Sequence, residues 1–260
     1  MASAIIGGLL AAALPPARIR VAVRTPQSAA RLATTFGIDA GCDIPAAIAG
    51  AGIVVLAAKP QQLGDILHGL AMPAGATAVS VAAGIRVPLL QRWLGTSIEV
   101  VRTMPNTPSM IGRGVTGLYA PSGTSALALA RAKGVMTAVG SVRVVDTEDA
   151  FDTLASISGC GPAYFYYFVE ALRDAGSALG LPADVAAALA IDTFTGAAAL
   201  AAARGEDVSL LRSQVVSKGG MTAAALARFD SGNLRGTVHH ALEAAIGRAR
   251  ELSAELESRQ

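Results

Sequence analysis

Cysteines and charged residues are both scarce in this sequence. Its 260 residues include two cysteines, Cys42 and Cys160, which stand far apart and form no C-x-x-C pair. That usage argues against a disulfide framework or a zinc site and fits a reducing compartment, so we expect a cytoplasmic protein. Charged residues make up 15% of the chain, the net charge is +2, and no run of Lys or Arg stands out. Nothing therefore indicates a nucleic acid or another polyanion as a partner.

Histidine is rare as well, with three in the chain. His239 and Glu243 are four residues apart and would share one face of a helix, as two metal ligands can. No third ligand stands near them, and His68 is isolated. A solvated helix face explains the pair better, and we expect no metal site.

The sequence also lacks a hydrophobic run that is long enough for a membrane span and free of polar interruptions. The apolar opening through Leu14 has no positively charged n-region, so a secretory signal is the weaker of two explanations for it. Residues 185–203 are rich in alanine, but Asp192 interrupts them, and they predict a buried helix rather than a membrane span. We expect no contact with a membrane.

The abundant residues form two different patterns, and 52% of the chain is hydrophobic. From Arg18 to about Val145, short β-branched runs alternate with helical stretches, which is typical of parallel strands covered on both faces. We predict an α/β domain over residues 1–147, with a Rossmann-like, doubly wound parallel sheet that binds ligands at the carboxyl ends of its strands. The expected strands are 19–23, 53–57, 77–81, 99–103, 115–119 and 142–145.

After residue 147 the pattern becomes helical, and we predict an all-α domain over residues 148–260. Gly180 and Pro182 mark the end of one helix and the start of the next. A helical domain of this size is too small to bury all of its alanine and leucine alone, so we expect its helices to interleave with those of a second subunit. The expected helices are 151–156, 163–179, 183–203, 222–229 and 239–256.

The end of the strand at 19–23 carries residues that can select a nucleotide. Beside the adenosine ribose of a dinucleotide-binding fold, an acidic residue binds NAD, whereas basic or hydroxyl residues admit the 2′-phosphate of NADP. Here the strand runs into Arg24 and Thr25, and no Asp or Glu occurs before Asp39. These two residues are suited to a phosphate. The alternative is an ordinary loop with a solvated arginine.

Three later strand ends face the same predicted crevice. Lys59 follows the strand at 53–57, and the proline after it stiffens the loop. Small residues end the strand at 77–81, and Asn106 stands between two prolines in a fixed turn with its amide free to bond. A surface lysine and a rigid connector are the alternatives. The residues expected to line a bound dinucleotide are Ala58, Lys59, Pro60, Ala82, Ala83 and Asn106.

Paired glycines precede a helical run in the segment SKGGMT, residues 217–222. Such a turn exposes several backbone N–H groups at a helix N-terminus, where the dipole adds positive potential, so the place suits a carboxylate. Thr222 adds a hydroxyl and Lys218 a positive charge. A plain helix N-cap, with Gly219 and Gly220 serving only the turn, is the alternative.

A second turn of small residues, SGCGP over residues 158–162, also precedes a helix. We expect its glycines to permit tight packing where a cofactor and a substrate meet. Cys160 is better explained as a packed thiol than as a nucleophile, because no basic residue is adjacent to it in the sequence.

Three stretches together resemble pyrroline-5-carboxylate reductase in order and spacing: RTMPNTPSMIGRGVTGLY (102–119), FDTLASISGCGPAYFYYFVEAL (151–172) and LRSQVVSKGGMTAAALARFD (211–230). The likeness extends over essentially the whole chain, and the GGxT element together with SGxGPAY and MPNTP is specific. The resemblance implies a Rossmann domain and a helical dimerisation domain, assembled as a homodimer or a larger ring of dimers. It also implies an enzyme of proline biosynthesis that reduces 1-pyrroline-5-carboxylate to L-proline with NADPH or NADH.

The same resemblance assigns roles to single residues. Few side chains need to take part in the reaction, because a protonated cyclic imine accepts hydride directly. The protein mainly orients the imine against the nicotinamide. Thr222 would donate to the ring nitrogen or to the carboxylate, a choice that the sequence leaves open. The positions implied along the cofactor are Thr25, Lys59, Ala83 and Asn106, and those implied at the substrate are Glu148, Met221 and Thr222, beside Gly219 and Gly220.

The chain departs from the family pattern in two places. Lys218 stands where the family most often has a proline, and Met221 replaces a smaller residue, which we expect to affect affinity modestly. Met1 aligns inside the phosphate-binding loop, so we expect the first strand and its glycine-rich loop to be missing, and interpret this as a start codon placed too late. The alternatives are an inactive homologue that acts only through its dimerisation domain, and a related imine or β-hydroxyacid reductase. The last should carry a GxxGxGxxxK-like turn, which does not occur between residues 156 and 175.

Overall fold

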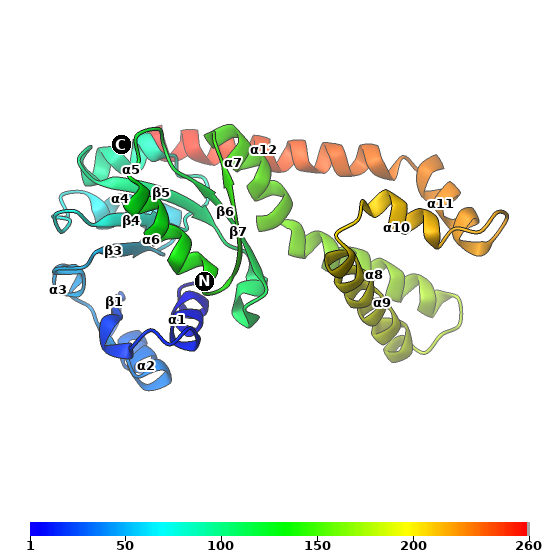
Figure 1. Cartoon of the computed structure of the whole chain (residues 1–260), viewed down its shortest axis with the longest axis horizontal. Coiled ribbons are helices and arrows are strands. Elements are labelled where there is room, and N and C mark those ends of the chain that lie inside the picture. Colours follow the sequence, from blue (N-terminus) through cyan, green and yellow to red (C-terminus); the bar gives the residue numbers. More distant parts are fainter. Residues whose placement is uncertain (259–260) are drawn as a thin grey trace. The chain divides into compact units, whose positions relative to one another are not determined.

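The computed structural model describes residues 1–258 and consists of two compact units (Figure 1). Unit 1 comprises residues 1–160 together with the segment that follows residue 244, and unit 2 comprises residues 161–244. The sequence analysis draws its boundary after residue 147, where strands give way to helices. The units divide later because the first helix beyond that point stays bound to the sheet of unit 1 through ion pairs.

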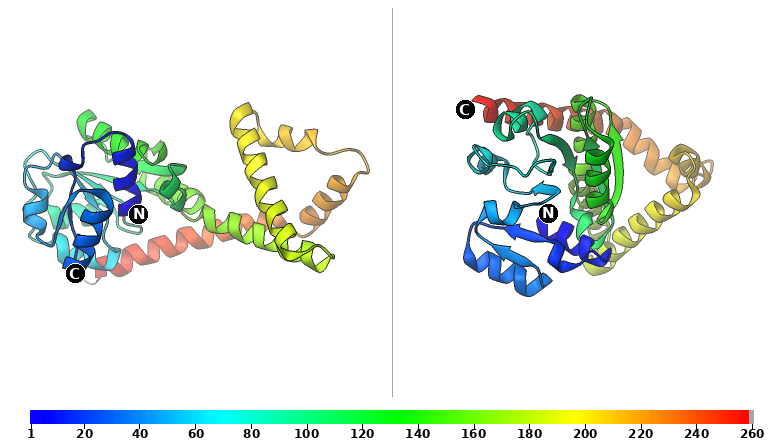
Figure 2. Two further views of the ribbon diagram at one scale, coloured as in Figure 1. Left: turned by 90° about the horizontal axis from the view of Figure 1, so that it is seen from below. Right: turned by 60° about the vertical axis from the view of Figure 1, so that its left-hand side comes forward.

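Unit 1 contains a five-stranded sheet and a separate two-stranded sheet. The strands lie where the β-branched runs predict them, apart from β2, whose short sequence Asp-Ala-Gly carries no strand signal. The larger sheet has the order β3-β4-β5-β6-β7, and β1 pairs with β2 (Figure 2). The strands are β1 (Arg20–Ala22), β2 (Asp39–Gly41), β3 (Ile53–Leu56), β4 (Thr77–Ser80), β5 (Glu99–Met104), β6 (Gly114–Tyr119) and β7 (Gly140–Val145).

One strand pair departs from the predicted parallel arrangement. β5 and β6 are antiparallel, with Arg102 opposite Tyr119 and Met104 opposite Gly117. The connection between them contains the short 3-10 helix η2 (Thr107–Ile111) and is too short for the crossover that a parallel pair requires. The pairs β3–β4, β4–β5 and β6–β7 are parallel, as predicted. The β1–β2 pair is parallel too, although the sequence analysis does not predict β2.

Helices cover both faces of the five-stranded sheet, which confirms the doubly wound prediction. Ala78 and Val100 pack with α4, α5 and the end of α12, while their neighbours Val79 and Val101 pack with α1 and α6 on the opposite face. β4 is buried throughout because it lies between these layers. The helices that belong wholly to unit 1 are α1 (Ala2–Ala11), α2 (Pro26–Phe36), α3 (Ile44–Ile48), α4 (Pro60–Leu67), α5 (Val87–Leu94), α6 (Ala126–Thr137) and α7 (Glu148–Leu154), and α12 spans Leu234–Ser258.

Unit 2 consists of helices joined by short loops over its described residues. Phe165 of α8 contacts Phe194 of α9 with ring centroids 5.1 Å apart, and Phe168 contacts Phe229 of α11 at 6.2 Å. The predicted helices are confirmed, and the short α10 is additional. These helices are α8 (Gly161–Ala178), α9 (Ala183–Arg204), α10 (Val208–Gln214) and α11 (Met221–Ser231), followed by the first part of α12, which then returns to unit 1.

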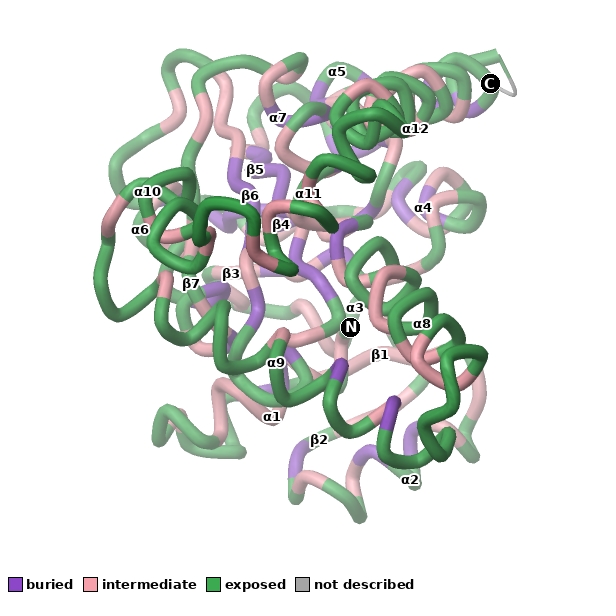
Figure 3. Tube along the Cα trace, turned by 90° about the vertical axis from the view of Figure 1, so that its right-hand side faces the viewer, coloured by how far each residue is buried: buried purple, intermediate pink, exposed green. Residues whose placement is uncertain are grey.

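α9 is far more exposed than the sequence analysis predicts. Ala186 and Ala190 are buried, whereas Leu189, Ile191 and Leu200 are exposed. Figure 3 shows exposed residues in green and buried ones in purple along the chain. Among residues 1–258, α9 is the one helix that is long and apolar enough to cross a membrane by length and composition. The expected burial fails within one chain because unit 2 has too few elements to cover each face of its helices.

Candidate active site

The carboxyl ends of β3, β4 and β5 reach one edge of the sheet, because these strands are parallel neighbours. The loops that follow them carry Lys59, Ala83 and Asn106. The structure therefore gathers these three predicted residues at a single edge, where ligands of doubly wound sheets bind. Arg24 and Thr25 follow β1, which belongs to the smaller sheet.

A cavity of about 2050 Å³ lies between β1 and β3. Arg24 lines it from the end of β1, and Ala58 and Lys59 line it from the end of β3. Both basic side chains are exposed, and within residues 1–258 neither pairs with an acidic side chain. Their charges are therefore available to an anion such as a phosphate. The predicted cofactor residues that lie outside the lining are Thr25, Pro60, Ala82, Ala83 and Asn106.

Thr25 acts as the N-cap of α2. Its Oγ1 accepts a hydrogen bond from the Ser28 N–H at 3.3 Å and lies 2.9 Å from the Ser28 hydroxyl. Pro26 occupies the first position of the helix, where a missing N–H costs nothing. The hydroxyl is thus engaged locally, and the positive potential at this end of β1 comes from Arg24 and the α2 N-terminus.

The turn after β4 is held by hydrogen bonds to Ser80. Its Oγ accepts from the Ala82 N–H at 3.3 Å, and its carbonyl accepts from the Thr103 hydroxyl at 2.9 Å. Ala82 is consequently buried, whereas Ala83 is exposed at the sheet edge. The small side chain of Ala83 leaves the backbone there uncovered, and its contact with a cofactor stays a prediction.

The side chain of Asn106 joins two separate segments of the protein by hydrogen bonds. Its Oδ1 accepts from the Val115 N–H and its Nδ2 donates to the Ser158 carbonyl, both at 2.9 Å. The residue is 8% exposed. The sequence analysis expects its amide to be free to bond, which is wrong because β6 and the turn before α8 both fold back onto it. Its predicted contact with a cofactor stays a prediction.

We expect Asn106→Ala to destabilise unit 1 by about 1–3 kcal/mol, because it leaves the Val115 N–H and the Ser158 carbonyl without their partner. Urea unfolding followed by circular dichroism measures the change. Gln27→Ala, at an exposed position of α2 in the same unit, is the control. An Asn106→Ala variant as stable as the parent would show that these two hydrogen bonds do not stabilise unit 1.

Glu148 begins α7 and faces back to the sheet. Its Oε1 accepts from Arg102 Nη1 at 2.8 Å and from the Val87 N–H at 2.9 Å. Arg102 lies in β5, is 2% exposed, and its guanidinium stands 4.4 Å from the centre of the Phe151 ring. Asp152 completes the cluster, with an oxygen 3.7 Å from Arg102 Nη2. Glu148 is therefore a structural residue of unit 1, whatever else it binds.

A second arginine extends this cluster to the surface. Arg86 pairs with Asp152 at 3.0 Å and with Asp149 at 2.8 Å. The hydrogen bond from Arg86 holds the pKa of Asp149 below its ordinary value. Burial, followed by the charge of Glu148, raises the pKa of Tyr119. The sequence analysis misses this cluster, although a lone arginine in the apolar strand 99–104 is a signal that it must have buried partners.

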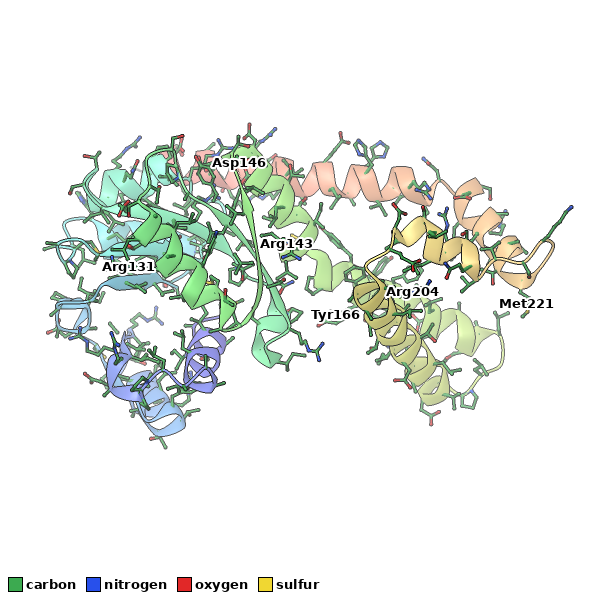
Figure 4. All side chains as sticks on the ribbon, in the orientation of Figure 1. Arg131, Arg143, Asp146, Tyr166, Arg204 and Met221 are labelled. Atoms are coloured by element: carbon green, nitrogen blue, oxygen red, sulfur yellow. The ribbon has the colours of Figure 1, made fainter. Side chains whose placement is uncertain are left out.

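In unit 2, the predicted carboxylate-binding turn leads directly into α11. Gly219 has a φ of +72°, and the Gly220 N–H donates to the Ser217 carbonyl at 3.0 Å. No side chain caps α11, so first-turn N–H groups remain available. Met221 is 92% exposed (Figure 4), and Thr222 is exposed beside it. The local geometry thus has the free donors that the sequence analysis expects.

The SGCGP turn overlaps a π-helical segment that the sequence analysis does not predict. This segment, η3 (Ala155–Gly159), joins α7 to α8, and π-helical turns often occur at functional sites. A Cβ at Gly159 would lie 2.9 Å from Met104 Cε, so the glycine permits the expected close packing. Cys160 is exposed within the chain, and the expectation of a packed thiol is wrong because the turn directs it outward.

Residues 1–258 contain no group of three or more His, Cys, Asp or Glu side chains placed to hold a metal ion. His239 and Glu243 form an exposed ion pair with a separation of 3.3 Å. This arrangement is the solvated helix face that the sequence analysis favours.

Comparison with protein families finds two matches along the chain. The family described as pyrroline-5-carboxylate reductase dimerisation matches residues 148–252, which begin where the sequence analysis starts its second domain. The family described as NADP oxidoreductase, coenzyme F420-dependent, matches residues 1–84.

Individual relatives extend these matches over nearly the whole chain. Pyrroline-5-carboxylate reductase of Pseudomonas aeruginosa is 38% identical over 258 residues, which are 98% of this chain and 94% of the relative. The solved pyrroline-5-carboxylate reductase of Coxiella burnetii has a TM-score of 0.87 and 38% identity, and the match covers 97% of this chain and 94% of that one. The Plasmodium falciparum pyrroline carboxylate reductase with NADP bound shares the fold, with a TM-score of 0.84, 24% identity and coverage of 96% and 94%. The chain therefore belongs to the pyrroline-5-carboxylate reductase family.

Proposed function

We propose that this chain reduces 1-pyrroline-5-carboxylate to L-proline by hydride transfer from NADPH, or from NADH, in the last step of proline biosynthesis. The observation that carries the proposal is the cavity at the strand ends, lined by Arg24 and Lys59 in a chain of this family. When bound, the dihydronicotinamide supplies the hydride. The residues of the chain bind and orient the two reactants.

The residues at the sheet edge fit an NADPH molecule. Arg24 and the N-terminus of α2 offer positive potential to a 2′-phosphate, and no acidic side chain stands at the end of β1. Lys59 offers a second charge across the cavity, and exposed Ala83 leaves room for a ring. We assign the cofactor contacts to Arg24, Thr25, Ala58, Lys59, Pro60, Ala82, Ala83 and Asn106.

We expect Arg24→Ala to raise the KM for NADPH by about 10–100-fold, since one charge-assisted hydrogen bond contributes about 1.5–3 kcal/mol. The KM for NADH should change little, because NADH has no 2′-phosphate for the guanidinium. Steady-state kinetics with both cofactors measure the ratio. Arg235→Ala, at an exposed position of α12, is the matched control. An equal rise in the KM for both cofactors would show that Arg24 does not bind the 2′-phosphate.

The substrate contacts that we propose use two kinds of donor and one acceptor. The free N–H groups at the start of α11 suit a carboxylate. The Thr222 hydroxyl is the proposed hydrogen-bond donor, toward either the ring nitrogen or the carboxylate. Glu148 Oε1 is engaged by Arg102 and Val87, and its Oε2 has no partner in the described chain and can accept from a protonated imine. The proposed set is Glu148, Gly219, Gly220, Met221 and Thr222.

The chain is proposed to act in the cytoplasm as a homodimer or a larger ring of dimers. Tyr166 and Tyr167 of α8 are 63% and 75% exposed in the single chain, and Figure 4 shows Tyr166 projecting from the helix. Aromatic side chains left this open are typical of interfaces. Both cysteines are free thiols, which fits a reducing compartment.

NADPH oxidation by the purified 260-residue chain, with and without 1-pyrroline-5-carboxylate, tests the proposal. We expect oxidation that depends on the imine and yields L-proline. Absence of turnover in a chain that is folded and dimeric would support the inactive homologue instead. The division of the sheet between β1 and β3 is the observation that favours this alternative.

A further inference from the structure

A closed ring of polar contacts joins three elements of unit 1: the start of α5, the strand β5 and the start of α7 (Figure 1). Arg86 Nη2 donates to one Asp152 oxygen at 3.0 Å, and the other Asp152 oxygen lies 3.7 Å from Arg102 Nη2. Arg102 Nη1 donates to Glu148 Oε1 at 2.8 Å, and the same oxygen accepts from the Val87 N–H at 2.9 Å. Val87 follows Arg86 in the chain, and the ring is thereby closed.

Most of this ring is shielded from water. The side chains of Arg102, Asp152 and Glu148 are 2%, 7% and 14% exposed. Arg86 is 30% exposed, and its Nη2 also donates to Asp149 on the surface. Charged hydrogen bonds are stronger in surroundings of low dielectric than in water. The ring therefore fixes the position of α7 against the start of α5.

The residues before Arg86 form the turn that we assign to the cofactor, residues 82–84. Gly84 has a φ of +71°, and a Cβ at this position would lie 3.3 Å from Leu252 Cβ of α12. Ile85, between the turn and the ring, is fully buried. Packing against α12 and the contacts of the ring thus limit the movement of this turn.

The helix that follows the turn takes its cap from α7. Arg86 is the N-cap residue of α5, and its side chain makes no capping hydrogen bond. Glu148 Oε1 supplies an acceptor for the first N–H of the helix, where the helix dipole favours a negative charge. Its second oxygen, Oε2, is the proposed acceptor for the protonated imine. One carboxylate therefore connects the element beside the cofactor turn with the proposed substrate.

We propose that Arg86 is a positioning residue for hydride transfer, which acts through the ring. It holds α7 against the loop that carries Ala83, and so fixes the position of Glu148 relative to the cofactor turn. Hydride transfer requires reacting atoms about 3–3.5 Å apart, and a misplacement of about 1 Å costs about 100-fold in rate. Arg24 and Lys59 are outside the ring, so the affinity for the dinucleotide does not depend on it. This inference rests on the proposed function.

The kinetic test is Arg86→Met, which removes the charge from the ring. We expect kcat to fall by about 10–100-fold, with a change of less than about 3-fold in the KM for NADPH. NADPH deuterated at the transferred position should show a larger isotope effect on kcat in the variant, because hydride transfer becomes slower relative to product release. Arg92→Met, at an exposed position of α5, is the matched control and should behave as the parent chain does.

Amide hydrogen exchange tests the same coupling without turnover. The Phe151 N–H lies within α7 and donates to the Thr147 carbonyl at 3.0 Å. Saturating NADPH should slow its exchange by about 10-fold in the parent chain and in Arg92→Met, but not in Arg86→Met. If circular dichroism shows that Arg86→Met does not fold, Arg86→Lys replaces it in both measurements. Lysine keeps the charge without the planar fork, so a smaller effect in the same direction is expected.

The outcomes distinguish this inference from the proposed function. Equal kcat, isotope effect and exchange in the Arg86 and Arg92 variants would overturn the inference alone, as would a rise in the KM for NADPH at unchanged kcat. A parent chain that binds NADPH without turnover would overturn the proposed function alone, and the exchange measurement would then decide whether the ring couples α7 to the cofactor turn. A parent chain that does not bind NADPH would overturn both.

Discussion

Arg102→Met is expected to destabilise unit 1 by about 3–5 kcal/mol, because it leaves two carboxylates without their buried cation. Glu148 and Asp152 are 14% and 7% exposed, and their oxygens lie 2.8 and 3.7 Å from the guanidinium. Methionine has a similar length and keeps the contact with Phe151, so the loss reports the charge rather than a cavity. Chemical unfolding monitored by tryptophan fluorescence measures it, since Trp93 packs in the core of this unit.

The control for this prediction is Arg248→Met. Arg248 also pairs with two carboxylates, those of Glu251 and Glu255, at 2.8 and 2.9 Å, but its side chain is 54% exposed. We expect little or no loss of stability there, because water screens exposed pairs. Similar losses of stability in the two variants would show that burial does not strengthen the ion pairs of Arg102.

Thr222→Val is expected to lower kcat by about 100-fold, the effect of removing one hydrogen-bond donor that acts in the transition state. Valine keeps the shape of threonine, and the hydroxyl has no partner within the described chain, so folding should be unaffected. Steady-state kinetics separate the two roles left open for this residue. A loss in kcat indicates donation to the ring nitrogen, whereas a rise in KM alone indicates the carboxylate.

Thr237→Val provides the comparison for Thr222. Thr237 is exposed on α12, and its hydroxyl donates to the Asn233 carbonyl at 3.2 Å. Its removal should leave kcat and KM unchanged. The proposed role fails if Thr222→Val retains the kinetic constants of the parent chain.

Most strands and helices are predictable because their residues repeat a local pattern. β-branched runs identify β3, β4 and β5, and Gly180 with Pro182 separates α8 from α9. The antiparallel pairing of β6 is not predictable in this way, since pairing direction depends on the length and path of a connection. The exposure of α9 is missed for a related reason, because periodicity shows that a helix is apolar but not what covers it.

The candidate site is predictable where a residue acts through its position at a strand end. Arg24 and Lys59 meet in one cavity because both follow strands that border it. The hydrogen bonds of Asn106 are not predictable, since its partners Val115 and Ser158 are distant in sequence and approach only through the antiparallel strand and the π-helical turn. The Arg102 cluster is not predictable for the same reason, because its carboxylates lie beyond the predicted domain boundary.

The return of α12 to unit 1 reverses the order in which the two units can mature during synthesis. Leu256 packs in the same core as Leu90 and Trp93, and a Cβ at Gly84 would lie 3.3 Å from Leu252 Cβ. The ribosome makes these α12 residues after the whole of unit 2, so the sheet unit begins first and is completed last. Until α12 is synthesised, the core residues of unit 1 that it covers are exposed to solvent. Aggregation is therefore most favoured during this interval, and a chaperone would act chiefly then.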